Sequence, residues 1–375
     1  VRPPLAGAGR GFCRLWGDKI GLALWYIWPN TRKNAPEAGE KGGRKMIGAI
    51  VGDIVGSVYE WNNIKTKDFE LFRKDCFFTD DTVMTCAVAQ AIMQGGEKDD
   101  FIDAMKRYGR MYPDAGYGGN FGVWLFSDDR EPYGSFGNGS AMRVSPCAWI
   151  MDCGFYARTG VWPVNGRKKV LLSARVTHDH PEGIKGAAAV AAAIFLCRYY
   201  FGGWCGDHEQ PIRDDPEECK RRIREYLERE YGYDLSPTLE EIRPGYRFNE
   251  TCQQTVPQAI IAFLESRDFE DAIRNAISLG GDSDTLAAIT GSIAEAAYGV
   301  PAWIEERALS YLDAPLLDVV CRWKAYLASL GVRPAGEAPG VCNQLPAAQA
   351  GRRSPDRPGT AGFLRQQPQN KKQPG

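Results

Sequence analysis

The sequence predicts an all-α protein, and three observations support this class. Apolar residues recur at helical spacing through most of residues 46–333, strand signals are scarce, and short Gly, Pro or Asp breaks separate the periodic segments. No repeat longer than a few residues interrupts this pattern. We therefore expect residues 46–333 to form one helical domain that begins at Met46.

The two ends of the chain differ from this body. In residues 1–45, basic residues precede the apolar run 20–28, as in a secretory signal peptide, but no clear small-x-small cleavage site follows before Pro29. Residues 334–375 are rich in Pro, Gly, Gln and Arg, with almost no large apolar side chains to offset the entropy cost of ordering. We expect a disordered N-terminal extension over 1–45, outside the fold, and a disordered tail over 334–375.

Local signals place the helices of the body in order along the chain. Residues 186–200 are rich in alanine and predict a helix that is buried on most faces. Residues 214–218 supply a cap, a proline for the first turn and two early acidic residues, which is typical of the start of a surface helix. The other predicted helices span residues 82–93, 101–108, 257–264, 268–279, 285–298, 302–311 and 316–330.

The formal net charge of -1 conceals an acidic body, because both chain ends are basic. Residues 46–333 carry 31 basic and 42 acidic side chains, a net charge of -11. This balance disfavours a nucleic-acid partner, because affinity for a phosphate backbone comes from clustered Lys and Arg. It suits a protein that binds metal cations or uses carboxylates in its chemistry.

Cysteine usage and hydropathy bear on the location of the protein. The eleven cysteines are odd in number and scattered without a C-x-x-C pair, and Cys86, Cys147 and Cys197 lie in apolar runs where a reduced thiol behaves as a small hydrophobe. No apolar run approaches the roughly 20 residues that span a bilayer. We expect a reducing, cytoplasmic location and no membrane partner.

Two similar acidic motifs, about 200 residues apart, are the sharpest features of the sequence. Thr79, Asp80 and Asp81 precede one predicted helix, and the segment 280–285, Gly-Gly-Asp-Ser-Asp-Thr, precedes another. One such cluster commonly caps a helix, since Asp, Ser and Thr are preferred caps. Two clusters with oxygen-only neighbours favour a hard cation such as Mg²⁺, Mn²⁺ or Ca²⁺. If the two helix starts converge, their carboxylates can bracket two cations.

Other interpretations of these acids stay open from the residues alone. Asp282 to Thr285 also fits the D-x-D nucleophile of phosphotransferases, but that motif ends a β-strand, and residues 272–279 before it favour a helix. Glu60 follows Asp53 and Gly56 at helical spacing, which places the three near one face of a helix. Glu60 is then either part of a site or a solvated surface acid.

Two glycine-rich segments, residues 116–120 and 133–143, are candidate phosphate-binding loops. Their Gly residues, with Ser and Asn, leave backbone N–H groups free to bind a diphosphate. Neither contains the Gly-Lys-Ser/Thr of a P-loop or a G-x-G-x-x-G after a strand, which disfavours nucleotide-triphosphate and Rossmann sites. Phe136 in the second loop either stacks on a base or anchors the loop.

His178 and His180 form a His-x-His pair just before the alanine-rich helix. Such a pair can bind zinc, but the sequence supplies no further zinc ligands at suitable spacing. The remaining interpretations are a capping loop and a histidine that contacts substrate.

Together these motifs resemble the ADP-ribosylglycohydrolase family, the group of dinitrogenase reductase-activating glycohydrolase and the ADP-ribosylhydrolases. The resemblance covers about residues 46–333, with the motifs in the family's order. It implies a single orthogonal multi-helix bundle with a binuclear Mg²⁺ or Mn²⁺ centre in a cleft, which cleaves the N- or O-glycosidic bond between ADP-ribose and a modified side chain. The segments that carry it are residues 52–60, 79–82, 137–143, 177–178 and 280–285.

The resemblance also implies roles for individual positions. Glu60 matches the acidic residue near the metals and the scissile bond, and with Asp80 and Asp81 it is a catalytic candidate. The implied metal ligands are Thr79, Asp80, Asp81, Asp282, Asp284 and Thr285. The implied substrate-binding residues are Gly119, Gly134, Ser135, Phe136, Gly137, Asn138, Gly139 and His178.

The implied enzyme uses two Mg²⁺ (or Mn²⁺) ions to hold the ribose hydroxyls and to position C1 of that sugar against a water, while nearby carboxylates offset the oxocarbenium charge. Its substrate is an ADP-ribosylated protein or a small ADP-ribosyl molecule, and we expect a monomer. Two alternatives stay open: a metal-dependent hydrolase of another nucleotide-like substrate, and a non-catalytic ADP-ribose-binding or structural family member. The linkage, to arginine, serine, another side chain or a nucleobase, is left open too.

Overall fold

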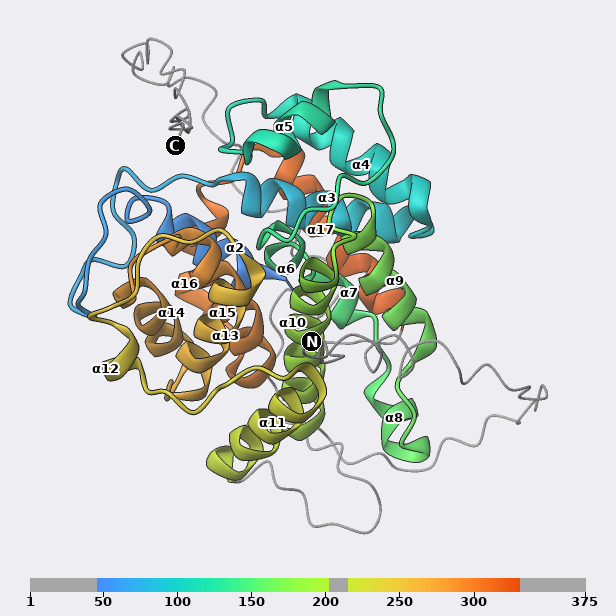
Figure 1. The fold of residues 1–375 in the computed structure, drawn as a ribbon. Coiled ribbons are helices and arrows are strands. Elements are labelled where there is room, and N and C mark those ends of the chain that lie inside the picture. Colours follow the sequence, from blue (N-terminus) through green and yellow to red (C-terminus); the bar gives the residue numbers. More distant parts are fainter. Residues whose placement is uncertain (1–45, 202–214, 331–375) are drawn as a thin grey trace, which may run out of the picture. The chain divides into compact units, whose positions relative to one another are not determined.

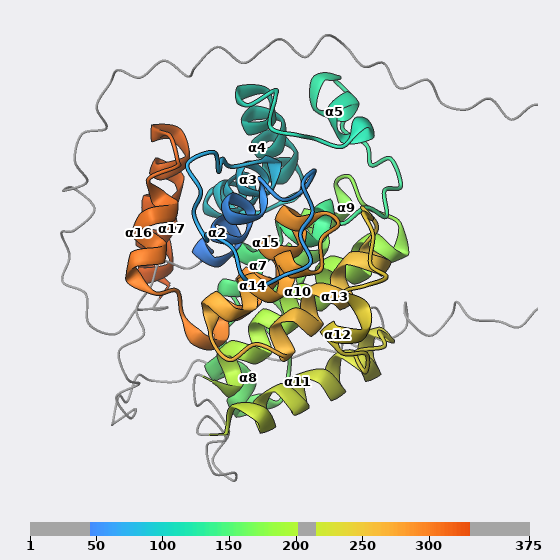
Figure 2. The ribbon, with the colours of Figure 1, turned by 90° about the vertical axis from the view of Figure 1, so that its left-hand side faces the viewer.

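The computed structural model describes residues 46–201 and 215–330, and within these ranges the regular structure is entirely helical (Figures 1 and 2). The described residues contain no β-strand, only an isolated bridge between Gly137 and Thr251. All of them belong to one compact unit. The all-α prediction is therefore confirmed. The extension over 1–45 and the tail over 334–375 lie outside the described residues.

The helices follow one another along the chain with short connections. Their bounds are α2 (Ile47–Gly56), α3 (Asp80–Gln94), α4 (Lys98–Met111), α5 (Gly119–Phe126), α6 (Gly139–Met142), α7 (Ser145–Trp149), α8 (Cys153–Thr159), α9 (Val164–Arg175), α10 (Pro181–Tyr200), α11 (Pro216–Tyr231), α12 (Leu239–Ile242), α13 (Cys252–Leu264), α14 (Phe269–Ser278), α15 (Ser283–Tyr298), α16 (Ala302–Leu309) and α17 (Ala314–Ser329).

The first and the third-last of these helices, α2 and α15, form the most extensive helix–helix contact in the described part of the chain (Figures 1 and 2). Glycines four residues apart line one face of α2 and allow the two backbones to touch. A Cβ atom added to Gly48 would lie 2.2 Å from the carbonyl oxygen of Gly291, and one added to Gly52 would lie 2.0 Å from that of Ala287. Only glycine permits so close a crossing.

A buried acid on α15 completes this contact at the N-terminal end of α2. The backbone N–H groups of Met46 and Gly48 donate to Oε2 of Glu295 at 3.1 and 2.9 Å. These N–H groups lie at the start of a helix and have no partner within it. Because Glu295 accepts from both, the position of α2 along α15 is fixed by hydrogen bonds as well as by packing.

The alanine-rich helix α10 lies at the centre of the fold (Figure 1) and packs against α15, α13, α9, α11, α6 and α7. Residues 186–197 of this helix are buried without interruption, as the sequence predicts. The helix begins earlier than expected, at Pro181, because the ring of His180 accepts from the N–H of Glu182 and caps it. Small alanine side chains let several helices approach α10 on different sides.

The charged helix α11 begins as its sequence predicts, whereas α13 does not. Asp215 caps α11 by accepting from the N–H of Glu218. The prediction that a helix begins at Pro257 is wrong, because α13 begins at Cys252 and contains Pro257 in its interior. The N–H of Cys252 donates to the Phe136 carbonyl at 3.0 Å. This tertiary contact stabilises an early start that local propensity disfavours.

Short helices between residues 119 and 175, together with α12, were not predicted from the sequence. Helices α6, α7 and α12 have four or five residues each, too few to show a helical period. Helix α5 contains glycines that lower its intrinsic propensity. Tertiary contacts therefore decide the structure of this region.

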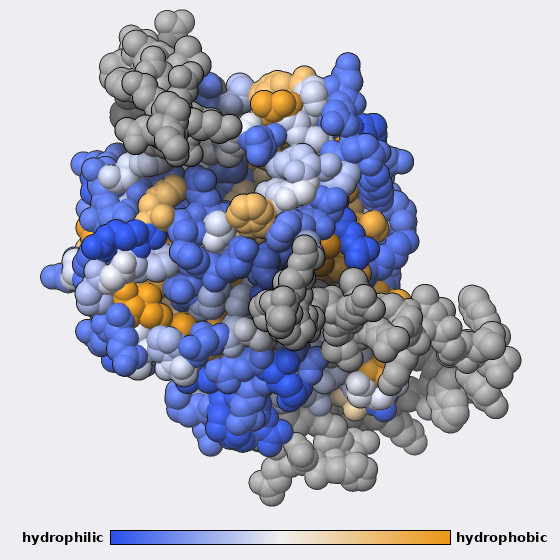
Figure 3. All heavy atoms as spheres, in the orientation of Figure 1, coloured by the Kyte–Doolittle hydropathy of each residue, from blue (hydrophilic) through white to orange (hydrophobic). Residues whose placement is uncertain are grey.

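The face shown in Figure 3 is largely hydrophilic, with small separate apolar patches. Cys86, Cys147 and Cys197 are buried free thiols, as their apolar surroundings predict. In the part of the chain that the structure describes, none of the helices combines the length and the apolar character needed to cross a bilayer.

We predict that Gly52→Ala destabilises the protein by about 2–3 kcal/mol, because its Cβ would overlap the α15 backbone. The gain in helix propensity, at most about 1 kcal/mol, does not compensate. Denaturant unfolding of the variant measures the loss. The matched control is Gly122→Ala on α5, where an added Cβ meets nothing within 4 Å. Equal stabilities of the two variants would contradict the close crossing of α2 and α15.

Candidate functional site

A buried aspartate near the end of α2 holds the start of α3 in place. Asp53 is fully buried, and its Oδ1 accepts from the hydroxyl of Thr79 at 2.7 Å. Its Oδ2 accepts from the backbone N–H groups of Thr79 and Thr82 at 2.9 and 3.0 Å. These bonds satisfy backbone donors at the start of α3 that have no partner within the helix. Asp53 therefore positions the first acidic motif.

The first turn of α3 carries two carboxylates, Asp80 and Asp81. Thr79 is the N-cap, and its side chain accepts from the N–H of Asp81 at 3.3 Å. The N–H of Asp80 donates to the carbonyl of Ala115 at 2.8 Å, which ties the helix start to the first glycine-rich loop. Asp80 and Asp81 thus occupy the first turn, where the positive end of the helix favours negative charge.

The second acidic motif follows a tight turn between α14 and α15. Gly280 and Gly281 have φ values of 67° and 77°, a left-handed conformation that glycine adopts without strain. Asn63 fixes this turn, since its Oδ1 accepts from the N–H of Gly281 at 2.7 Å and its Nδ2 donates to the carbonyl of Gly281 at 2.9 Å. Asp282 then occupies the N-cap position of α15 without a capping hydrogen bond from its side chain, and Asp284 lies in the first turn.

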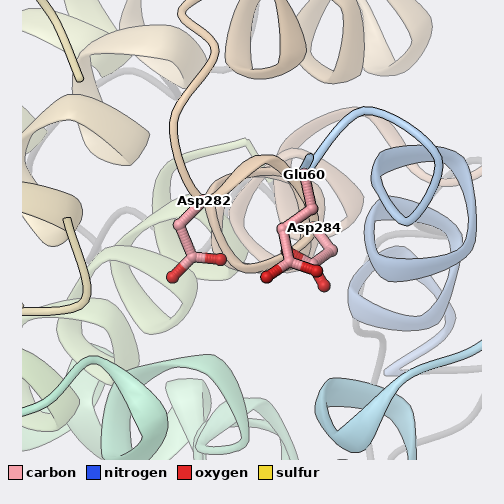
Figure 4. A group of neighbouring side chains, drawn as sticks. All are labelled: Glu60, Asp282 and Asp284. Carbon is pink, nitrogen blue, oxygen red and sulfur yellow. The ribbon is translucent and has the colours of Figure 1, made fainter. Parts of the chain in front are cut away.

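The two helix starts converge. The hydroxyl of Thr285 at the start of α15 donates to Oδ2 of Asp81 at the start of α3, at 3.1 Å. Carboxylate oxygens of Glu60, Asp282 and Asp284 all lie within 4.8 Å of one another (Figure 4). Hydrogen bonding and proximity thus bring the two acidic motifs together, as a shared metal site would require.

Glu60 reaches this cluster by a route different from the one its spacing predicts. The prediction that Asp53, Gly56 and Glu60 share a helix face is wrong for Glu60, because α2 ends at Gly56. A Cβ on Gly56 would lie 2.5 Å from Cα of Asp284, so α2 ends directly against the start of α15. The turn after Gly56 then brings the half-buried Glu60 to the acidic cluster.

Burial and mutual repulsion raise the pKa of the clustered acids. Burial is the larger cause for Asp80, Asp81 and Asp284, followed by repulsion from neighbouring carboxylates, and their pKa values lie well above the ordinary range. Burial, with repulsion by Asp284, raises the pKa of Glu60 to about 8. Ionising all of these groups together would therefore require positive charge from outside the cluster.

The acidic cluster opens into a cavity of about 670 Å³. Acidic residues predominate among the charged residues that line it, and Arg143 is the only lysine or arginine that the described lining contains. Trp61 and Phe248 also line the cavity, and their rings are stacked with centroids 5.3 Å apart. The acidic lining residues are Glu60, Asp80, Asp81, Asp114, Glu250, Asp282 and Asp284.

The second glycine-rich loop forms another part of the cavity lining. Gly137, Asn138 and Gly139 line it, and the N–H of Asn138 donates to the carbonyl of Glu250 at 2.7 Å. The Asn138 side chain turns towards the acidic cluster, where its Nδ2 donates to Oδ2 of Asp282 at 2.6 Å. Asn138 therefore contacts a candidate metal ligand directly, a role its position in the loop did not indicate.

The other loop residues divide between the cavity and its surroundings. Gly119 and Ser135 line the cavity, whereas Gly134 and Phe136 are not among its lining residues. The N–H of Gly134 donates to Oδ1 of Asp179 at 2.8 Å. Phe136 is 47% exposed and packs against the ring of His180, with centroids 5.3 Å apart.

The two histidines of the His-x-His pair have different environments. His178 is buried, lines the cavity and lies 2.8 Å from the hydroxyl of Thr177 through its Nδ1. His180 caps α10. Among the described residues, the one cluster of potential metal ligands is Glu60, Asp282 and Asp284, which contains neither histidine. The capping interpretation therefore holds for His180.

The phosphotransferase interpretation of the second acidic motif is wrong. That motif would follow a β-strand, but the element before it is helix α14, which begins after its cap Asp268 and ends at Ser278.

The sequence also left several cavity residues without a role: Trp61, Asp114, Arg143, Phe248 and Glu250. The structural role of Asp53 could have been inferred from the sequence, because a carboxylate within an apolar helix is buried only when it has hydrogen-bond partners.

Comparisons with known proteins show which family the chain resembles. The ADP-ribosylglycohydrolase family model matches residues 43–334. ADP-ribosylhydrolase ARH3 of Homo sapiens and that of Bos taurus are each 29% identical over 317 residues, covering 68% of this chain and 84% of the relative. ADP-ribosylarginine hydrolase Tri1 of Pseudomonas putida is 24% identical, covering 71% and 73%. A solved ADP-ribosylglycohydrolase-related protein complex aligns with a TM-score of 0.48 and 23% identity, covering 76% of this chain and 94% of the other.

The fold and the site define a helical protein with buried carboxylates at two converging helix starts. The chain belongs to the ADP-ribosylglycohydrolase family. This membership confirms both the resemblance seen in the sequence motifs and the expectation of a hydrolase.

We predict that the metal-free protein becomes less stable as the pH rises from about 5 to about 8. The pKa of Glu60 is about 8 in the folded state, and burial also raises those of Asp80, Asp81 and Asp284. In the unfolded chain the pKa values of these carboxyl groups are about 4, so the folded protein binds more protons than the unfolded chain over this pH range. The stabilisation is complete below the unfolded pKa and is lost as the pH passes the folded pKa.

Calorimetry of the chelator-treated protein measures this effect. Saturating Mg²⁺ should raise the Tm more at the upper end of the range than at the lower end, because it offsets carboxylates that ionise as the pH rises. The double variant Asp80→Ala, Asp81→Ala serves as the comparison and should lose most of the Mg²⁺ response. An Mg²⁺ shift that is independent of pH would count against a cation at these acids.

Proposed function

We propose that the protein hydrolyses the glycosidic bond between ADP-ribose and a modified protein side chain, or a related ADP-ribosyl adduct, with a binuclear Mg²⁺ or Mn²⁺ centre. The observation that carries this proposal is the convergence of the two acidic helix starts in one cavity, marked by the hydrogen bond from Thr285 to Asp81. Relatives named ADP-ribosylhydrolase and ADP-ribosylarginine hydrolase support the ADP-ribosyl substrate.

The residues at the two helix starts fit divalent cations. Their donors are carboxylate and hydroxyl oxygens, the ligand type that Mg²⁺ and Mn²⁺ prefer. Oδ1 of Asp81 is buried and has no hydrogen-bond partner among the described residues, so it retains a free acceptor for a cation. The proposed ligands are Thr79, Asp80, Asp81, Asp282, Asp284 and Thr285.

Divalent cations, when bound, would supply positive charge for the ribose hydroxyls and for a nearby water. The residues of the chain would perform the other tasks. Glu60, half-buried beside Asp284, would be ionised when bound cations offset the charge of its acidic neighbours. It would then hold the attacking water and accept its proton, with Asp80 and Asp81 as the other candidates for this role. The surrounding carboxylates would offset the positive charge that develops on the sugar ring as the bond breaks.

The glycine-rich loops and His178 would bind the ADP part of the substrate. The backbone of Gly137, Asn138 and Gly139 lines the cavity without large side chains. Arg143 is the only lysine or arginine in the described lining. Ser135 and Gly119 also line the cavity. Gly134 and Phe136 belong to the same loop but are not in the cavity lining. We propose that their contacts with Asp179 and His180 hold the loop in shape.

An assay with defined substrates tests the proposed function. The protein is incubated with arginine-linked and with serine-linked ADP-ribosyl peptides, with Mg²⁺ and with EDTA, and free ADP-ribose is measured. Release with Mg²⁺ and none with EDTA is the expected result. Turnover of other nucleotide-like glycosides without release from either peptide would instead favour the alternative hydrolase. Binding of ADP-ribose without any release would favour a non-catalytic protein.

We predict that the double variant Asp80→Ala, Asp81→Ala loses more than about 100-fold of the rate of ADP-ribose release, since even an outer partner of a metal ligand is worth about 10- to 100-fold. The matched control is Asp99→Ala, Asp100→Ala, which removes an acidic pair from the first turn of α4, away from the cavity lining. This control should keep its activity. Full activity in the Asp80, Asp81 double variant would refute the proposed metal centre.

A further inference from the structure

Arg143, the C-cap residue of α6, is a buried cation to which the proposed reaction gives no role. It is 1% exposed, and in the described ranges it forms no ion pair with a carboxylate. Burial lowers the pKa of its guanidinium only to about 10, so it remains charged at neutral pH. Its Nε is buried and has no hydrogen-bond partner among the described residues. The guanidinium lies 5.4 Å from the centroid of the Phe121 ring, but a buried charge that has no carboxylate partner remains costly.

The guanidinium fixes the direction of a hydrogen bond at Thr177. Nη2 of Arg143 donates to Oγ1 of Thr177 at 2.8 Å and to the carbonyl of Ser173 at 3.1 Å. A guanidinium only donates, so the Thr177 oxygen must accept from it. The hydroxyl proton of Thr177 then has to point to another acceptor, and Thr177 is fully buried from water.

The acceptor within reach is the ring of His178. Nδ1 of His178 lies 2.8 Å from Oγ1 of Thr177. If the hydroxyl donates to Nδ1, this nitrogen carries no proton, and the neutral ring must carry its proton on Nε2. In the opposite tautomer the buried hydroxyl proton of Thr177 would have no acceptor among the described residues, which costs free energy.

Nε2 of His178 faces the glycine-rich loop of the cavity. A Cβ added to Gly139 would lie 3.2 Å from Nε2, and one added to Gly137 would lie 3.6 Å from it. His178, Gly137 and Gly139 all line the cavity. The absence of side chains at these two glycines leaves Nε2 accessible from the part of the cavity proposed to hold the diphosphate.

We propose that Arg143 and Thr177 are positioning residues that fix His178 in the tautomer protonated on Nε2, so that this N–H donates to the diphosphate of the ADP-ribosyl substrate. The second half of this inference rests on the proposed function, and the first half does not. The charge of Arg143 acts in the same sense, since a buried guanidinium without a carboxylate hydrogen-bond partner among the described residues attracts an anionic ligand to its part of the cavity wall.

The tautomer of His178 can be measured without any ligand. The chain has three histidines, so ¹⁵N-histidine labelling gives few ring signals, and the variant His178→Gln identifies those of His178. Nε2 couples to both ring C–H protons, whereas Nδ1 couples strongly to one. We expect the protonated nitrogen of His178 at neutral pH to be Nε2. A protonated Nδ1 in the wild-type protein would overturn the proposal.

Variants at Thr177 test how the tautomer is set. Thr177→Val removes the hydroxyl with little change in shape, and the protonation of Nε2 should be partly lost. Its Kd for ADP-ribose, measured by calorimetry, should rise roughly tenfold, the effect of one hydrogen bond to a charged group. Thr177→Ser restores the hydroxyl and should restore both properties. A tautomer and an affinity unchanged in Thr177→Val would overturn the proposal.

A second pair of variants separates positioning from folding. Arg143→Met removes the obligatory donor, so Nδ1 can donate to Thr177 and its protonated form should appear. Thr290→Val on α15 is the control, because it also removes a buried hydroxyl bonded to a carbonyl, that of Ala259, but lies outside the cavity lining. The control should leave the tautomer and the Kd unchanged, and a matching loss of affinity there would assign the Thr177 effect to stability alone.

Failure of the proposed function is distinguishable from failure of this inference. If wild-type protein binds no ADP-ribose while His178 carries its proton on Nε2, the proposed substrate is wrong and the fixed tautomer stands. If ADP-ribose binds tightly while the protonated nitrogen is Nδ1, the positioning role of Arg143 and Thr177 is wrong and the proposed function stands.

Discussion

The close crossing of α2 and α15 is the constraint on which the site depends. Gly48, Gly52 and Gly56 let the α2 backbone touch that of α15, and the end of α2 therefore lies against the start of α15. Asp53 near that end holds the start of α3 through three hydrogen bonds to Thr79 and Thr82. One backbone contact thus aligns the starts of two helices that are far apart in sequence.

This arrangement concentrates negative charge at a cost that the protein alone does not offset. Helix N-termini favour carboxylates, but the buried acids at both starts have raised pKa values because they are desolvated and repel one another. Arg143 is the only lysine or arginine in the described cavity lining. Its guanidinium donates to Ser173 and Thr177 and lies over the ring of Phe121, so it forms no hydrogen bond with the clustered acids. Bound cations would offset the negative charge of these buried carboxylates. An acidic protein body is therefore compatible with a buried site of this kind.

The sequence predicts the elements with strong local signals and fails where tertiary contacts decide. The alanine-rich α10 and the capped α11 are recognisable because their patterns are long or their caps explicit. The convergence of the two acidic motifs could only be stated as a condition, since no local pattern encodes a contact such as that of Thr285 with Asp81. The turn that carries Glu60 and the early start of α13 were missed for the same reason.

The cavity also has two chemically different parts, and this difference bears on what can bind there. Carboxylate and hydroxyl oxygens with excess negative charge lie at the helix starts, whereas Arg143 supplies positive charge near the glycine-rich loop and Nε2 of His178, the proposed donor, faces that loop. A ligand that spans both parts needs hydroxyl groups at one end, which can coordinate cations, and anionic oxygens at its other end. A ribose linked to a diphosphate has these groups in one molecule, whereas an uncharged glycoside would bring no anionic group to the guanidinium of Arg143.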